Sequence, residues 1–128
     1  MRLLVGALLA ALAAGCAGCA ADTAGPARAA ERFHAALASG RFESACGLLA
    51  PKTAEKLPAP GRTCADALRE QRLGPGGRPT EVSVWDDEAQ VRLEGDTLFL
   101  HHFGDGWRVV AAGCAPVRDL PYECGVEN

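Results

Sequence analysis

The spacing of apolar residues after position 26 predicts an amphipathic helix. Ala30, Phe33 and Leu37 recur at intervals of three and four residues within the range 27–39, so they share one helical face. Gly40 follows at the position where a glycine commonly ends a helix. We therefore expect the first helix to pack one side against a core and to stop before Gly40.

The next thirty residues predict a second helix, a short helical turn and a third helix. These elements are expected in the ranges 42–49, 52–61 and 63–73. The second must stop before Pro51, and two further prolines limit the turn. Thr63 can accept a hydrogen bond as the N-cap of the third helix, with Asp66 three residues on as its capping-box partner.

Beyond the glycine- and proline-rich segment 74–79, the hydrophobic period changes from 3.6 to 2, which is typical of strands. Apolar and polar side chains alternate in four short segments, 82–84, 89–93, 97–103 and 107–113. The turns between them are short, and short turns join antiparallel neighbours. The pattern predicts an α+β domain of about three helices packed on a curved four-stranded meander, with 114–128 as a tail.

The start of the chain has a different pattern. A single positive charge at Arg2 precedes an apolar run over 3–14, and Gly15 and Cys16 follow. This order is typical of a secretory signal. The run is about a dozen residues long, short of the roughly 20 that a membrane-crossing helix needs. Residues 1–15 are therefore predicted to be a removable signal peptide.

The residues before Cys16 resemble the lipobox of bacterial lipoproteins, with Ala13 as a departure from the leucine preferred there. The resemblance implies that Cys16 carries a diacylglycerol thioether and often a further acyl chain, and two or more chains anchor a protein stably. Cys19 is a rival with a poorer match, and plain secretion is the alternative. The expected location is the extracytoplasmic face of the cell membrane, with a flexible tether over 16–26 and one domain over 27–128.

Composition and charge exclude some partners. Of 13 basic side chains only Arg2 lies in the signal, so 12 remain against 16 acidic ones. The basic residues are scattered singly, whereas a nucleic-acid-binding domain usually has a basic face. Neither nucleic acid nor a polybasic contact with anionic lipid is expected, and the covalent lipid is the predicted link to the membrane.

Six cysteines are present, and the exported location favours disulfides. With Cys16 lipidated, four cysteines fall in the domain and allow three connectivities. We favour Cys46 with Cys64 and Cys114 with Cys124, because each pair lies within one local unit. Cys19 is then a spare thiol. No CxxC pair lies in the domain and the histidines are dispersed, so no metal or cofactor is expected.

The order of helices and strands, together with the segments 33–37, 45–51, 104–110 and 113–114, resembles the nuclear transport factor 2-like superfamily, in particular small exported lipoproteins of actinobacterial type. The resemblance implies a cone-shaped fold whose pocket serves isomerases, dehydratases, ligand-binding proteins or dimers. Fold alone does not choose among these activities.

The candidate catalytic residues are histidines. His34 lies one position from the apolar stripe of the first helix and could reach a pocket rim, where a neutral imidazole can act as a base. His101 and His102 are adjacent in a strand and must point to opposite faces; His102 shares its face with Leu98 and Leu100. Packing or surface roles are the simpler interpretation of each. The acidic residues 86–88 and Asp105 are interpreted as solvated turns rather than a calcium site.

Two hypotheses from different classes follow, with a third beside them. The first is a membrane-anchored, non-enzymatic module that binds a small ligand or an envelope protein. The second is a pocket enzyme, an isomerase, dehydratase or hydrolase, with a histidine as general base. The third is a purely structural envelope protein.

Overall fold

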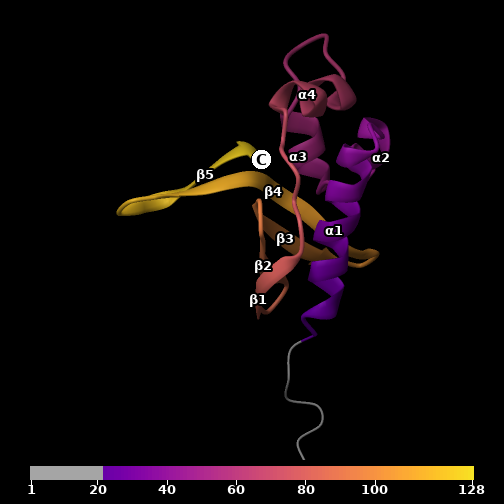
Figure 1. Ribbon diagram of the computed structural model, residues 1–128. Coiled ribbons are helices and arrows are strands. Elements are labelled where there is room, and N and C mark those ends of the chain that lie inside the picture. The colour runs from indigo at the N-terminus through magenta and orange to yellow at the C-terminus, as the bar shows by residue number, and fades with distance from the viewer. Residues whose placement is uncertain (1–21) are drawn as a thin grey trace, which may run out of the picture.

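The computed structural model describes residues 22–128, which form an α+β domain with the helices first and the strands after them (Figure 1). The helices are α1 (Ala24–Ala38), α2 (Phe42–Gly47), α3 (Pro51–Lys56) and α4 (Cys64–Gln71). The strands are β1 (Pro79–Trp85), β2 (Glu88–Leu93), β3 (Thr97–Phe103), β4 (Gly106–Val117) and β5 (Leu120–Val126). The predicted signal peptide, the lipidation residue Cys16 and Cys19 lie outside the described residues.

Helix α1 begins at Ala24, so the predicted tether over 16–26 extends too far by three residues. The carboxylate of Asp22 accepts hydrogen bonds from the backbone N–H groups of Ala24, at 3.0 Å, and Gly25, at 3.4 Å. Pro26 fits the first turn because the N–H it lacks would have no partner within the helix. Pro26 therefore lies inside α1 and not in a tether before it.

The described part of the chain has four helices, one more than predicted. The extra helix is α3, in which Pro51 occupies a first-turn position rather than only ending α2. The capping prediction for α4 is confirmed, because the Thr63 hydroxyl accepts a hydrogen bond from the backbone N–H of Asp66 at 3.1 Å. Gly40 has a φ of +69° just beyond the end of α1, as expected for the residue that ends a helix.

The sheet has five antiparallel strands in the order β1-β2-β3-β4-β5. The prediction of four strands and a C-terminal tail was wrong, because β4 continues to Val117 and β5 returns beside it. Pro116 lies at an irregularity in the β4 ladder, and Pro121 lies in the edge strand β5. Those are positions where a sheet tolerates proline. Figure 1 shows the β4–β5 hairpin extending away from the helices.

Both predicted disulfides are confirmed within the described residues. The Cys46–Cys64 bond joins α2 to α4, and the Cys114–Cys124 bond joins β4 to β5. Each closes a local unit, with sequence separations of 18 and 10 residues. Such loops reduce the freedom of the unfolded chain.

The core lies between α1 and one face of the sheet. Phe33 of α1 is completely buried there, and the strands supply most of the other fully buried side chains. The larger of these are Leu49, Leu68, Val91, Leu98, Leu100, Val109 and Val126. Apolar side chains therefore fill the space between helix and sheet, and any cavity must lie at its margin.

The segment that enters α3 is attached to β4. The backbone of Val109 donates to the Leu48 carbonyl at 2.9 Å and accepts from the Ala50 N–H at 2.7 Å. The buried hydroxyl of Thr53 donates to the Val110 carbonyl at 2.8 Å. On its side away from β3, this part of β4 thus pairs with the segment that enters α3, while its later residues pair with β5.

Candidate functional site

A buried histidine and a buried carboxylate meet at the margin of the core. Nε2 of His34, in α1, lies 2.6 Å from Oδ2 of Asp96, in the turn between β2 and β3. The side chains are 7% and 6% exposed. The position of His34 beside the apolar stripe brings it to the edge of the helix–sheet interface. Because both side chains are buried, each depends on the other as a hydrogen-bond partner.

The turn at Gly95 and Asp96 is held so that the carboxylate points inward. The Asp96 carbonyl accepts from the Leu93 N–H at 2.7 Å, and the Gly95 N–H donates to the Gly76 carbonyl at 2.8 Å. A side chain at Gly95 would place its Cβ 2.2 Å from the Pro75 carbonyl oxygen. The segment before β1 and this turn can therefore lie this close only because residue 95 is glycine.

Both oxygens of the Asp96 carboxylate act as acceptors. Its Oδ1 accepts from the backbone N–H of Thr97 at 2.7 Å, and its Oδ2 accepts from the N–H of Gly113 at 3.2 Å as well as contacting His34. The hydrogen-bond network therefore assigns the proton between the two side chains to Nε2 of His34. In the neutral imidazole, the lone pair then lies on Nδ1.

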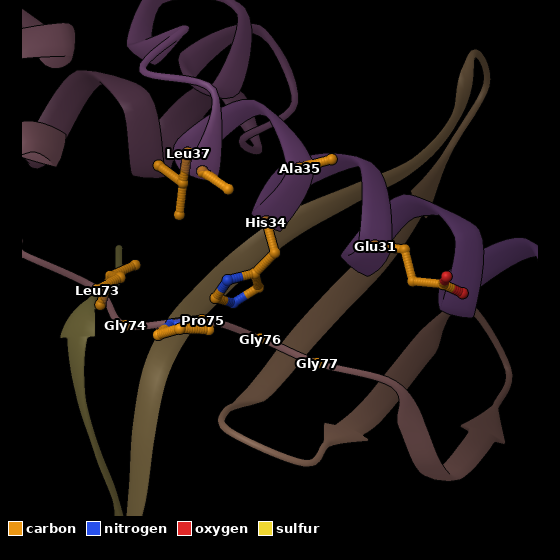
Figure 2. Close-up of a pocket in the computed structure, with 10 residues that line it drawn as sticks. Glu31, His34, Ala35, Leu37, Leu73, Gly74, Pro75, Gly76 and Gly77 are labelled. Atoms are coloured by element: carbon orange, nitrogen blue, oxygen red, sulfur yellow. The ribbon is translucent and has the colours of Figure 1, made fainter.

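Nδ1 of His34 is not fully buried. It has no hydrogen-bond partner among residues 22–128, and no fully buried side-chain nitrogen or oxygen in that range lacks one. The atom must therefore be accessible. Figure 2 shows the imidazole directed from α1 toward Leu73 and Pro75 across a cavity. The structure thus presents an oriented hydrogen-bond acceptor at a cavity wall.

The cavity has a volume of about 450 Å³ and lies between α1 and the connection from α4 to β1. Most of its wall is apolar, and the polar side chains in it are those of His34 and Glu31. The lining residues are Glu31, His34, Ala35, Leu37, Ala38, Leu73, Gly74, Pro75, Gly76 and Gly77. Within residues 22–128, no lysine or arginine lines this cavity.

Gly76 allows the connection to pack directly on the histidine ring. A Cβ at this position would lie 2.6 Å from Cγ of His34 and 2.8 Å from Cδ1 of Leu93. Real Cβ atoms do not approach so closely, so a side chain here would displace the ring or the segment. Residues 74–77 of the glycine-rich segment, which the sequence indicates only as a helix breaker, form one wall of the site.

The two strand histidines point to opposite faces, as predicted. His101 lies 2.5 Å from Oε1 of Glu88 and lines a second cavity of about 430 Å³ beside Phe103 and Lys52. His102, one of the two candidate catalytic residues, is 48% exposed and packs on Trp107 with ring centroids 4.9 Å apart. It lines neither cavity, because its strand has passed beyond the core at that point.

The predicted solvated turn at Asp105 has a structural role. Its carboxylate pairs with Arg108, which holds the pKa of Asp105 below its ordinary value. Arg108 also donates to the carbonyl of Gly47, at 3.0 Å. The pair therefore links the β3–β4 turn to the end of α2. Within residues 22–128, no cluster of three histidine, cysteine, aspartate or glutamate side chains could hold a metal ion.

Sequence reasoning found His34 but missed Asp96 and Gly76. An aspartate after a glycine between two strands is usually an exposed turn residue, and nothing in the local pattern distinguishes Asp96 from Asp105. The one signal for Asp96 is the position of His34, since a histidine beside a buried apolar stripe needs a hydrogen-bond partner.

Comparison of the chain with protein-family models, with curated proteins and with solved structures gives no match. None of the helices within residues 22–128 has the length and apolar character of a membrane-crossing segment.

Proposed function

We propose that the protein is a lipid-anchored, extracytoplasmic binding module whose small ligand occupies the cavity beside His34. The observation that carries the proposal is the free Nδ1 of a histidine that Asp96 holds in one orientation. The anchor rests on the sequence around Cys16, which lies outside the described residues.

The cavity has the features of a small-molecule site. Such sites are largely apolar, measure roughly 300–1,000 Å³ and contain a few fixed polar groups. Here Leu37, Leu73 and Pro75 supply apolar surface, and His34 supplies a polar atom that cannot rotate away without losing its bond to Asp96. A preorganised acceptor lowers the ordering cost of binding.

Membership of the nuclear transport factor 2-like superfamily is part of the proposal. Its support is the order of the elements, helices followed by an antiparallel sheet, with α1 packed across one sheet face. Because apolar side chains fill the space between α1 and the sheet, the proposed ligand lies at the rim of the fold rather than deep within it.

A pocket enzyme is the second candidate, and the contact between His34 and Asp96 favours it. A carboxylate that fixes one imidazole nitrogen leaves the other as an oriented general base. Glu31 is the other titratable side chain that lines the cavity. Catalysis requires turnover that disappears when His34 is replaced, whereas a binding module with His34 intact would release its ligand chemically unaltered.

Native mass spectrometry tests the proposal. The protein would be extracted from its own membranes in a mild detergent and compared with H34Q, in which the Gln amide can still donate to Asp96. We expect a small molecule bound to the wild type and its loss from H34Q. Recovery of the wild type without any bound molecule, from several growth conditions, would support a purely structural envelope role.

The anchor is tested by the intact mass of the same preparation. The expected chain begins at Cys16 and carries a diacylglycerol group with or without a further acyl chain. An unmodified chain that begins at another residue would contradict lipidation while leaving the cavity proposal in place.

A further inference from the structure

We infer that the ligand of the His34 cavity is a small protonated amine with an apolar body. The inference rests on the proposed function and adds the chemical class of the ligand. It follows from three features of the cavity: the sign of its charges, the direction of its hydrogen bonds and the nature of its walls.

The charges around the cavity are negative. Glu31 lines it, and the carboxylate of Asp96 lies behind the imidazole, 2.6 Å from its other nitrogen. Arg72 and Arg78 flank the lining segment in sequence, but neither lines the cavity. A bound anion would therefore approach two carboxylates without a lining cation, whereas a bound cation would be attracted by both.

The side-chain groups in the wall accept hydrogen bonds. In the neutral imidazole, Nδ1 of His34 carries the lone pair, because Nε2 donates its hydrogen to Asp96, and the Glu31 carboxylate is an acceptor as well. An alkylammonium group has three N–H donors and no acceptor. It can donate to Nδ1, while Glu31, one turn earlier on the same helix, adds a longer-range attraction, since Figure 2 shows its carboxylate turned away from the imidazole.

The remaining wall suits an aliphatic group. Leu37 and Ala38 from α1 face Leu73 and Pro75 from the connection. Burial of apolar surface against them favours binding. The ligand therefore has a polar end that is cationic and a body that is apolar, both of which a simple cycloalkylamine provides.

Three probes with the same six-membered ring test the class of ligand: cyclohexylamine, cyclohexanol and cyclohexanecarboxylate. Each is titrated at about pH 7, where the amine and the acid are charged, into the full chain in detergent. Binding is followed through the backbone amide signals of Gly74, Gly76 and Gly77. We expect the amine to bind about tenfold more tightly than the alcohol, a difference of ~1.4 kcal/mol, and the carboxylate to bind most weakly.

Variants assign the contacts. Glu31→Gln removes the charge and keeps the shape, so it should weaken the amine several-fold and leave the alcohol unchanged. Glu55→Gln, on α3 and away from the cavity, makes the same change in net charge and should have no effect. His34→Gln retains a donor to Asp96 but removes the acceptor at Nδ1, so it should weaken both the amine and the alcohol.

The experiment distinguishes failure of the amine inference from failure of the proposed binding function. Equal binding of alcohol and amine, with no effect of Glu31→Gln, would overturn the inference and leave the cavity as a binding site. Tightest binding of the carboxylate would overturn it as well. Unchanged amine binding to His34→Gln would show that Nδ1 is not the contact. If none of the probes moves the amide signals of Gly74, Gly76 and Gly77, the inference and the proposed function both fall.

Discussion

Oδ2 of Asp96 lies 2.6 Å from Nε2 of His34, although 62 residues separate the two in the chain. The contact joins the middle of α1 to a turn between two strands, and it fixes which imidazole nitrogen faces the cavity. Since both oxygens of Asp96 also accept from backbone N–H groups, at Thr97 and Gly113, the carboxylate connects three parts of the fold. Its replacement should therefore affect both stability and the site.

Asp96→Asn should lower the free energy of unfolding by about 1–3 kcal/mol, because a buried donor is left without an acceptor. Each carboxylate oxygen accepts from a backbone N–H, so an amide must turn its own NH₂ group toward one of them. Urea denaturation measures the loss. Asp87→Asn, on a side chain that is 70% exposed, is the matched control and should change stability by less than about 0.5 kcal/mol. Equal values for the two variants would contradict the assigned network.

Gly76→Ala should destabilise the protein by about 1–3 kcal/mol, the usual cost of overpacking. Its Cβ would meet the His34 ring at 2.6 Å, so the ring must shift and the side-chain NMR signals of His34 should move. Gly74→Ala is the control, because a Cβ there meets nothing within 4 Å. A tolerated Gly76→Ala with unchanged His34 signals would show that the connection is looser than described.

Removal of the Cys46–Cys64 disulfide, by alanine at both positions, should cost about 3 kcal/mol on the loop-entropy model. The bond holds α2 against α4 across a separation of 18 residues. The Cys114–Cys124 bond should contribute less, since the β4–β5 hairpin already brings its ends together through backbone hydrogen bonds. Chemical denaturation of the two double variants checks the order, and the reverse order would contradict this explanation.

Thr63→Ala should cost about 1 kcal/mol, the usual contribution of an N-cap. The Thr63 hydroxyl also interacts with the Asp66 carboxylate and lowers the pKa of Asp66 in the folded protein. A lowered folded pKa stabilises the fold above the unfolded pKa, and that contribution is lost as pH falls through the folded pKa. The deficit of Thr63→Ala should therefore be larger at neutral pH than in acid.

Thr63→Ser keeps the hydroxyl and is the control for this prediction. NMR titration of the Asp66 carboxyl should show its pKa rise in the alanine variant and stay low in the serine variant. A deficit that is the same at every pH would mean that Thr63 acts only through the backbone N–H of Asp66.

Much of the fold could be predicted from the sequence, because local signals determine it. Each of these signals is contained in a few neighbouring residues: the apolar stripe of α1, the cap at Thr63 and the change of hydrophobic period after Gly74. The disulfide pairing followed from proximity along the chain.

The misses have physical causes. Strand β5 lacks a clear apolar alternation because it is an edge strand with exposed residues, and the prolines in the hairpin indicate a tail unless the bulge at Pro116 is known. Asp96 could not be recognised because tertiary contacts, not local sequence, turn its carboxylate inward. The sequence therefore indicated His34 as a site residue but not its partner Asp96.

Gly113, whose N–H donates to Asp96, directly precedes Cys114, the β4 end of the hairpin cross-link. Its φ of +65° favours glycine, and a Cβ there would lie 2.6 Å from Leu73, a residue of the cavity wall. One stretch of backbone therefore serves the oxidised hairpin, the carboxylate behind His34 and the wall itself. Reduction of the Cys114–Cys124 disulfide would therefore loosen Gly113, and through Asp96 it would loosen the support of the His34 imidazole.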